Sequence, residues 1–367
     1  MAIDRRTMLK ALGASASLLS TPVFSLPASG NIFLSAANID GANHARLFNE
    51  AGRLLGDIKL PGRGHGGAFN TTNKHGVLFA RRPGNFAIVF APKGQVLHTL
   101  TTPPERHFYG HGIFSQDGRL LFTTENDYEN TRGIIGIWDV RDQYTRIGEF
   151  NSAGVGPHDI SLMPDKRTLV VANGGIETHP DTGRRKLNIP DMEPTLALID
   201  SMDGKLIASH SLPKNLNKLS IRHLAVNQAG TIGAALQYQG PSEDLLPLVF
   251  TLNNGRLKLL SARKSVQQAM KNYCGSIAMD RSGTLMAVSS PRGNLVTFWL
   301  CATGELITTL DVQDVCGLAA TSKPFVFVLS GGTGERLIYN AKSKLTMRLP
   351  SPSHAQWDNH IQSTTNF

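Results

Sequence analysis

A strand–turn–strand signature recurs along this chain at a spacing of about 40 to 60 residues. In each copy a short apolar strand runs into an Asp-Gly-like turn, and a second strand follows that ends in a polar loop. The signature is clearest in four segments, 111–127, 158–175, 223–240 and 276–294. Segments 64–85 and 316–334 follow it more loosely, and a third and a fourth apolar stretch come after each copy. Four strands repeated at this spacing are typical of a β-propeller blade.

The number of units predicts a seven-bladed ring. Six units have all four strands, at 62–103, 106–152, 154–213, 219–262, 272–312 and 314–350. Residues 31–60 supply only three strands, and the segment 358–366 near the C-terminus provides a fourth. We therefore expect an all-β seven-bladed β-propeller of four-stranded blades, closed by pairing the N- and C-terminal segments. Such closure leaves no exposed sheet edge.

Composition agrees with one large β domain over residues 31–367. Charged residues make up 18% of the chain and hydrophobic residues 41%, and 36 Gly and 19 Pro suit many short strands joined by turns. The formal net charge is +9, but the Lys and Arg residues are scattered and no basic stripe interleaved with aromatic residues occurs. This argues against nucleic acid as a partner. We expect a monomer.

The N-terminal segment resembles a twin-arginine export signal. Arg5 and Arg6 precede Met8, Leu9 and Lys10, and a mildly apolar stretch rich in Ala, Ser and Leu follows. We assign residues 1–30 to this signal, with cleavage between about residue 25 and residue 30. The apolar stretch is too short for a stable membrane anchor. The mature protein is therefore expected in the periplasm, exported in folded form and without stable membrane insertion.

Five histidines occupy the start of the first strand in five adjacent blades: His65, His111, His158, His223 and His360. First strands line the central channel of a propeller, so these side chains are expected to converge. Imidazole is a good ligand for iron, copper, zinc and nickel, which predicts a metal site. His65 and His158 are offset by one residue from His111 and His223, and a β-bulge or the neighbouring glycines can absorb this offset. The alternative is a water-filled channel in which the histidines bind backbone carbonyls.

Polar loops after the second strands supply further candidates on the same face. They are Arg82, Glu125, Asp127, Glu177, His179, Gln237 and Arg292. The carboxylates are expected either to orient metal-binding histidines or to accept protons in a reaction, the alternative being ordinary polar loops. The long insertion 174–194 is a candidate cap over the channel mouth or a docking site for a partner.

The three cysteines leave several interpretations open. Cys274 and Cys316 fall near the equivalent positions of the two blades without a histidine. They can form a disulfide, act as soft metal ligands or be small buried apolar residues, as Cys301 is expected to be. No HExxH, Cys-x-x-Cys, Cys-x-x-Cys-His or G-x-S-x-G motif occurs in the sequence, so zinc-protease, covalent-haem and serine-hydrolase assignments lack support.

Four segments, 106–139, 154–194, 221–241 and 357–362, resemble a domain-of-unknown-function family of twin-arginine-exported propellers from Gram-negative bacteria. The resemblance covers essentially the whole mature chain and implies a role in periplasmic iron handling. It implies iron-uptake proteins of the imelysin or peroxidase type as partners.

The preferred hypothesis is a propeller that binds a transition metal, iron or alternatively copper, for metal acquisition. One rival is an enzyme, either a metal-dependent redox protein or a lactonase-like hydrolase, which would need a carboxylate such as Glu125 or Glu177 in the ring. A second rival is a metal-free interaction scaffold. The sequence does not decide whether the protein is an enzyme.

Overall fold

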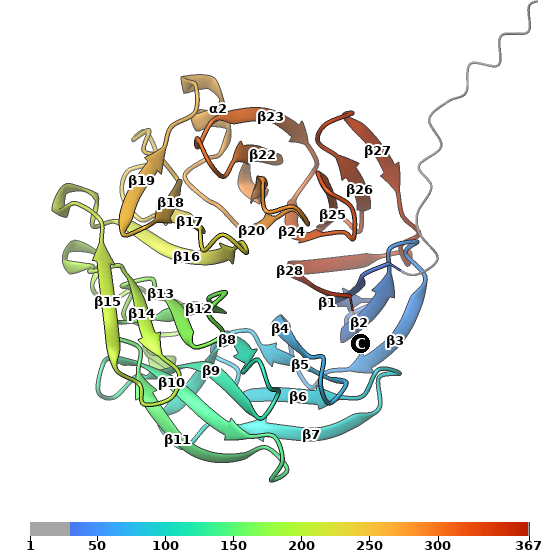
Figure 1. Cartoon of the computed structure of the whole chain (residues 1–367), viewed down its shortest axis with the longest axis vertical. Helices are drawn as coiled ribbons and strands as arrows, with labels where there is room; N and C mark the ends of the chain where they lie inside the picture. The colour runs from blue at the N-terminus through green and yellow to red at the C-terminus, as the bar shows by residue number, and fades with distance from the viewer. Residues whose placement is uncertain (1–29, 366) are drawn as a thin grey trace, which may run out of the picture.

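The structure is a computed structural model that describes residues 30–365 and 367. These residues form a ring of seven antiparallel sheets of four strands each (Figure 1). The predicted all-β seven-bladed propeller is therefore confirmed. The proposed twin-arginine motif lies outside the described residues. No helix among the described residues is long and apolar enough to cross a membrane.

Six blades are built from consecutive strands. Their bounds are β4 (Gly64–Asn70), β5 (His75–Ala80), β6 (Phe86–Phe90) and β7 (Val96–Thr101); β8 (Arg106–Phe114), β9 (Leu120–Asp127), β10 (Arg132–Asp139) and β11 (Thr145–Asn151); β12 (Pro157–Leu162), β13 (Thr168–Asn173), β14 (Thr195–Asp200) and β15 (Leu206–Ser211); β16 (Leu219–Val226), β17 (Ile232–Tyr238), β18 (Val249–Asn253) and β19 (Arg256–Leu260); β20 (Ser276–Met279), β21 (Leu285–Ser290), β22 (Leu295–Leu300) and β23 (Leu306–Asp311); β24 (Val315–Ala320), β25 (Val326–Gly331), β26 (Arg336–Asn340) and β27 (Leu345–Arg348).

Short helical turns occupy some of the connections. They are η1 (Pro180–Thr182), η2 (Ile189–Asp191), η3 (Lys214–Leu216), α2 (Lys264–Ala269) and η4 (Pro291–Gly293). Two of them, η1 and η2, lie in the long insertion between β13 and β14.

The seventh blade joins the two ends of the described chain, as predicted. Its strands are β1 (Ile32–Ile39), β2 (Ala42–Asn49), β3 (Leu54–Lys59) and β28 (Ala355–Thr364), in the order β28-β1-β2-β3. The antiparallel register pairs Ile32 with Thr364 and Ala37 with Trp357. Because β28 is the inner strand of this blade, the C-terminal segment contributes directly to the channel (Figure 1).

Apolar side chains fill the space between neighbouring sheets. Phe79 and Phe108 meet between two blades with their ring centroids 5.8 Å apart, and both are fully buried. Phe298 and Phe327 meet between two others at 5.6 Å. Large aromatic side chains at blade interfaces supply much of the apolar area that each sheet buries. The ring of interfaces holds the inner strands around the channel.

The inner strands are irregular where they reach the channel. The β12–β13 ladder shifts register between Pro157 and Asp159, which leaves His158 unpaired. Equivalent shifts interrupt the ladders of β4, β8, β16, β24 and β28. A bulge re-aims the side chain of the extra residue. These bulges absorb the one-residue offset between the histidines that the sequence shows.

Candidate metal centre

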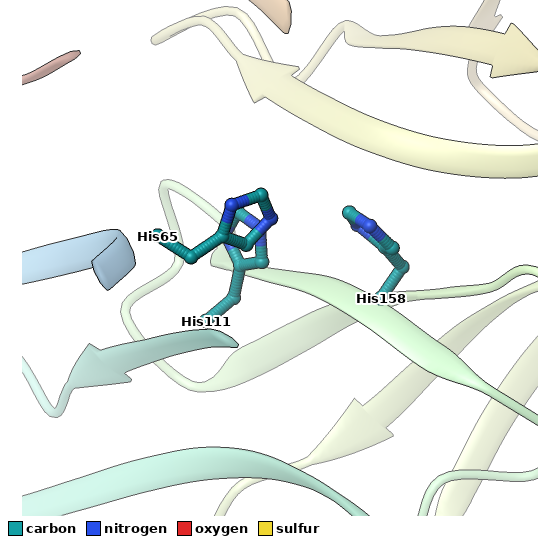
Figure 2. Close-up of side chains that lie close together, drawn as sticks. All are labelled: His65, His111 and His158. Atoms are coloured by element: carbon teal, nitrogen blue, oxygen red, sulfur yellow. The ribbon is translucent and has the colours of Figure 1, made fainter. Parts of the chain in front are cut away.

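The five predicted histidines meet in the middle of the channel. They come from the inner strands β4, β8, β12, β16 and β28, and all five are buried. Ring centroids of neighbouring members lie between 4.5 and 5.9 Å apart. Figure 2 shows three of them, His65, His111 and His158, with their rings close together. We call His65, His111, His158, His223 and His360 the histidine cluster.

Two overlapping sets of three can each surround one ion. His65, His111 and His158 offer ring nitrogens that all lie within 4.8 Å of one another, and so do His111, His223 and His360. Four ring nitrogens are buried and have no hydrogen-bond partner among the described residues: His111 Nε2, His158 Nδ1, His223 Nδ1 and His360 Nε2. Buried polar atoms are normally paired, so four ring nitrogens without a protein partner in one cluster are available to bind a ligand.

Two glycines allow the rings to approach so closely. A Cβ atom on Gly110, whose φ is +100°, would lie 2.6 Å from Cδ2 of His65. A Cβ on Gly66 would lie 2.8 Å from Nδ1 of His111. Both distances are shorter than van der Waals contact. Any larger residue at these two positions would displace a histidine of the cluster.

Two carboxylates that sequence reasoning did not select contact the cluster. Asp358 Oδ1 lies 3.5 Å from Nδ1 of His65. Asp159 Oδ1 lies 3.2 Å from Nδ1 of His111, and its second oxygen accepts a hydrogen bond from the Leu224 N–H at 2.9 Å. A carboxylate at Nδ1 keeps the proton there and leaves Nε2 free to bind a metal. Asp159 therefore orients His111 toward the centre.

Four rings of the cluster, those of His65, His158, His223 and His360, are neutral near pH 7. Burial lowers the pKa of His65 to about 4, although its hydrogen bond to Asp358 acts in the opposite direction. Burial also lowers the pKa values of His158, His223 and His360 well below the usual value, with further lowering from neighbouring cationic groups. Neutral imidazole is the form that binds metal ions. No proton has to be displaced from these rings at neutral pH.

The cluster lies between two cavities of the channel. A cavity of about 880 Å³ opens at the starts of the inner strands and is lined by His65, His158 and His223. A second cavity of about 280 Å³ lies toward the ends of these strands and is lined by His111, His223 and His360. An ion or small molecule can thus approach the cluster from two sides.

Several predicted face residues line the larger cavity. Arg82, Gln237, Arg292 and Cys316 are among them. Gln237 donates to the backbone carbonyl of Cys274, and the Arg292 guanidinium lies 4.3 Å from the centre of the Tyr273 ring. These side chains form the approach to the cluster.

Of the roles left open for Glu125 and Asp127, orientation of the histidines is not seen, because neither carboxylate contacts the cluster among the described residues. Both belong to β9, which places the Glu125 side chain within the blade rather than in the channel. Its carboxylate accepts hydrogen bonds from Thr123 (2.8 Å) and Arg146 (3.0 Å), and burial raises its pKa. Asp127 pairs with Arg132 at 2.7 Å. The two carboxylates stabilise their own blade.

Glu177 and His179 also lie away from the cluster. His179 caps η1 and its Nε2 lies 3.1 Å from Glu129 Oε1. The backbone N–H of Glu177 donates to Asn188, which shapes the insertion. Neither residue lines the larger cavity. The hydrolase alternative called for a carboxylate such as Glu125 or Glu177 beside the cluster; the structure places neither of these two there, and the carboxylates that contact the cluster are Asp159 and Asp358.

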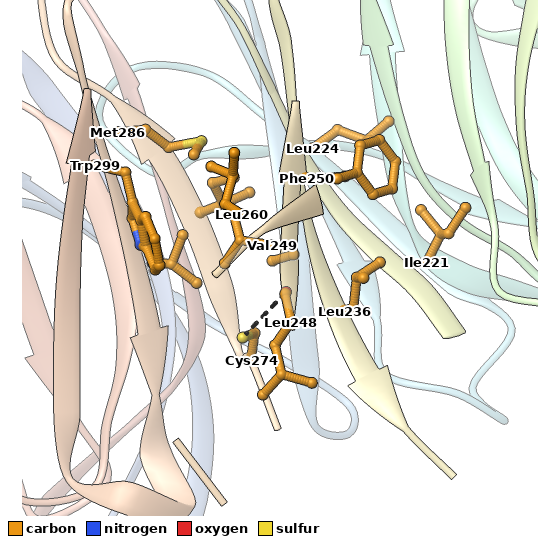
Figure 3. Close-up of a cluster of buried hydrophobic side chains, with 14 of the residues drawn as sticks. Ile221, Leu224, Leu236, Leu248, Val249, Phe250, Leu260, Cys274, Met286 and Trp299 are labelled. Carbon is orange, nitrogen blue, oxygen red and sulfur yellow. Dashed lines mark hydrogen bonds between the residues drawn. The ribbon is translucent and has the colours of Figure 1, made fainter. Parts of the chain in front are cut away.

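The cysteines are free and buried. Cys274 packs in an apolar cluster with Leu236, Leu248 and Trp299, and its thiol donates to the Leu248 carbonyl at 3.6 Å (Figure 3). Burial raises its pKa to about 12, so the thiol stays protonated. Of the interpretations left open, a Cys274–Cys316 disulfide is absent from the described residues, and Cys274 is a buried apolar packing residue rather than a ligand.

Comparisons with known proteins agree with the fold. Among solved structures, hydrazine synthase of Kuenenia stuttgartiensis matches with a TM-score of 0.60 and 11% sequence identity, over 88% of this chain and 95% of that chain. At this identity the similarity shows the propeller fold alone. No curated protein matches the chain significantly. A family described as protein of unknown function (DUF1513) matches residues 58–364, and the chain belongs to that family.

Proposed function

We propose that the histidine cluster binds one transition-metal ion. The observation that carries this proposal is the set of four buried ring nitrogens without a hydrogen-bond partner among the described residues. A scaffold with a water-filled channel would instead bond its histidines to backbone carbonyls. Leaving a buried polar atom unpaired costs about 1–3 kcal/mol, and a bound ion would offset this cost for each ring nitrogen that it contacts.

One ion fits the geometry better than two. Both sets of three ring nitrogens include His111. Its Nδ1 faces Asp159, so only Nε2 is available to an ion. A single lone pair binds a single metal. We therefore propose one ion near His111, bound by His111 together with two or three other members of the cluster.

The donor set consists of imidazoles. Such a set binds Cu²⁺ most tightly among the divalent ions, and it also accepts Fe²⁺, Ni²⁺ and Zn²⁺. The family resemblance implies iron, and we propose iron acquisition in the periplasm as the biological role, with imelysin-type or peroxidase-type proteins as partners. Copper is the alternative, because a selective supply rather than raw affinity decides which ion a site holds in the cell.

The test is the metal content of the purified full-length protein. The double variant His111→Ala/His158→Ala should lose bound metal, whereas the wild type should hold about one ion per chain after dialysis against Fe²⁺ or Cu²⁺ and removal of excess ion. The matched control is His179→Ala/His210→Ala, because both of these histidines lie outside the cluster. Circular dichroism checks the β fold of each variant. Unchanged metal content in the cluster variant would refute the proposal.

The proposed location in the periplasm needs a separate measurement. Cell fractionation should place the mature protein in the periplasm, and substitution of Arg5 and Arg6 by Lys should retain it in the cytoplasm.

A further inference from the structure

The larger cavity above the histidine cluster is strongly basic. Seven cationic side chains line it, against the two carboxylates of Asp314 and Asp358. Asp358 is already engaged by Arg63 at 2.5 Å and by Arg81 at 3.5 Å. The cavity thus presents far more positive than negative charge to its contents.

Five of these cationic groups have no ion-pair partner in the described part of the chain. They are Arg82, Arg184, Lys186, Arg222 and Arg292, and we call the cavity that they line the basic vestibule. They come from separate segments of the chain: β16, two blade loops and the insertion 174–194. Lys186 donates a hydrogen bond to Gln239 Oε1, and Arg82 donates one to Thr178 Oγ1 at 3.1 Å. The partners of these two cationic side chains are therefore uncharged.

Two buried polar groups in the vestibule wall are also unpaired. Arg222 Nε and Tyr109 Oη are inaccessible to solvent and have no hydrogen-bond partner among the described residues. The β16–β17 register passes from Ile221 to His223, so Arg222 is the unpaired residue of the bulge. Burial and repulsion by Arg222, Arg292 and Arg82 lower the pKa of Lys186. Mutual repulsion of this kind is relieved by a bound anion.

We propose that the basic vestibule binds a small anion that carries two or more carboxylate or phosphate groups. The planar guanidinium fork matches both groups through paired hydrogen bonds. A volume of about 880 Å³ is larger than one oxyanion needs and falls in the range of pockets for small organic ligands. The anion would lie directly above His65, His158 and His223, where its charge balances a cation held by the cluster.

Titration calorimetry on metal-free wild-type protein tests the proposal, with citrate and pyrophosphate as separate probes and acetate as the single-charge comparison. Metal should be removed on a chelating resin, because soluble chelators such as EDTA are themselves polycarboxylates. We expect 1:1 binding of citrate or pyrophosphate with a Kd below about 1 mM at low salt, and much weaker binding of acetate. The probe with the lower Kd shows whether the vestibule prefers carboxylate or phosphate groups.

Arg222→Gln and Arg82→Gln should each weaken binding about tenfold or more, because each removes a charged hydrogen-bond donor. The control is Arg256→Gln, which removes one positive charge from exposed surface on β19 and should leave binding unchanged. Thermal melts check that each variant folds. Absence of saturable binding of both probes, or equal weakening in the Arg256→Gln control, would overturn the proposal. Since the protein is metal-free throughout, this result is independent of the metal test above.

Discussion

Asp358 is the carboxylate whose loss should affect the channel most. It is 5% exposed, and it lies 2.5 Å from Arg63, 3.5 Å from His65 and 3.5 Å from Arg81. Burial opposes its ionisation, but His65 and the two arginines outweigh burial and hold the Asp358 pKa well below its usual range. The carboxylate is therefore fully charged at pH 7. Asp358→Asn keeps the shape of the side chain and removes this charge.

The expected cost follows from the exposure of its partners. The Arg63 side chain is 56% exposed, so water screens its pair with Asp358 and the loss contributes less than about 1 kcal/mol. The Arg81 side chain is 18% exposed and would be left as an uncompensated, largely buried cation. Breaking a buried pair costs about 3–5 kcal/mol. Allowing for partial exposure, we expect the free energy of unfolding to fall by roughly 3 kcal/mol.

Urea denaturation of the metal-free protein at pH 7 measures this loss. Asp117→Asn is a matched control, because Asp117 lies at the same 3.5 Å from Arg119 but the two side chains are 56% and 62% exposed. The control should lose less than about 1 kcal/mol. If the free energy of unfolding falls no more in the Asp358 variant than in the control, burial does not strengthen this ion pair, and the reasoning fails.

Three further predictions concern groups in or near the channel. His107 donates to the Phe108 carbonyl and accepts from Asn126, and burial lowers its pKa from 6.5 to about 4. The unfolded chain then binds more protons, so His107 should cost the wild type roughly 2 kcal/mol of stability between pH 7 and pH 5. Denaturation at both pH values should show a smaller loss for His107→Gln, and an equal loss would contradict the assignment. Asp159→Asn should weaken metal binding about 10- to 100-fold in a competition titration with little change in circular dichroism, because His111 loses the group that sets its tautomer; wild-type affinity would exclude that role. Gly110→Ala should lower both the melting temperature and the metal content, because its Cβ would collide with His65; a fully loaded, stable variant would show that His65 is dispensable.

The fold could be predicted because each blade is a nearly independent local pattern. The unit predicted at 106–152 corresponds to β8 through β11, Arg106–Asn151. Ring closure followed from a missing strand at one end and a spare strand at the other. Neither step required knowledge of side-chain contacts.

The carboxylates beside the cluster were harder to find. Asp159 directly follows His158 in sequence, yet it contacts His111 on the neighbouring blade. Asp358 lies two residues before His360, yet it contacts His65, again on a neighbouring blade. Contacts between blades depend on the rotation of one sheet against the next, which a pattern within one blade does not contain. The channel role considered for Glu125 failed for a related reason, since alternation along β9 turns its side chain into the blade.

Closure of the ring by β28 ties the candidate centre to the pairing of two segments that lie far apart in the sequence. This last strand brings His360 into the cluster and Asp358 beside His65, and it does so only once it pairs with β1. A chain that lacks its final segment would have an open sheet edge and an incomplete set of donors at the same time. Binding of an ion by the full set of histidines would then require a closed ring, so the proposed metal binding should be lost whenever β28 separates from β1.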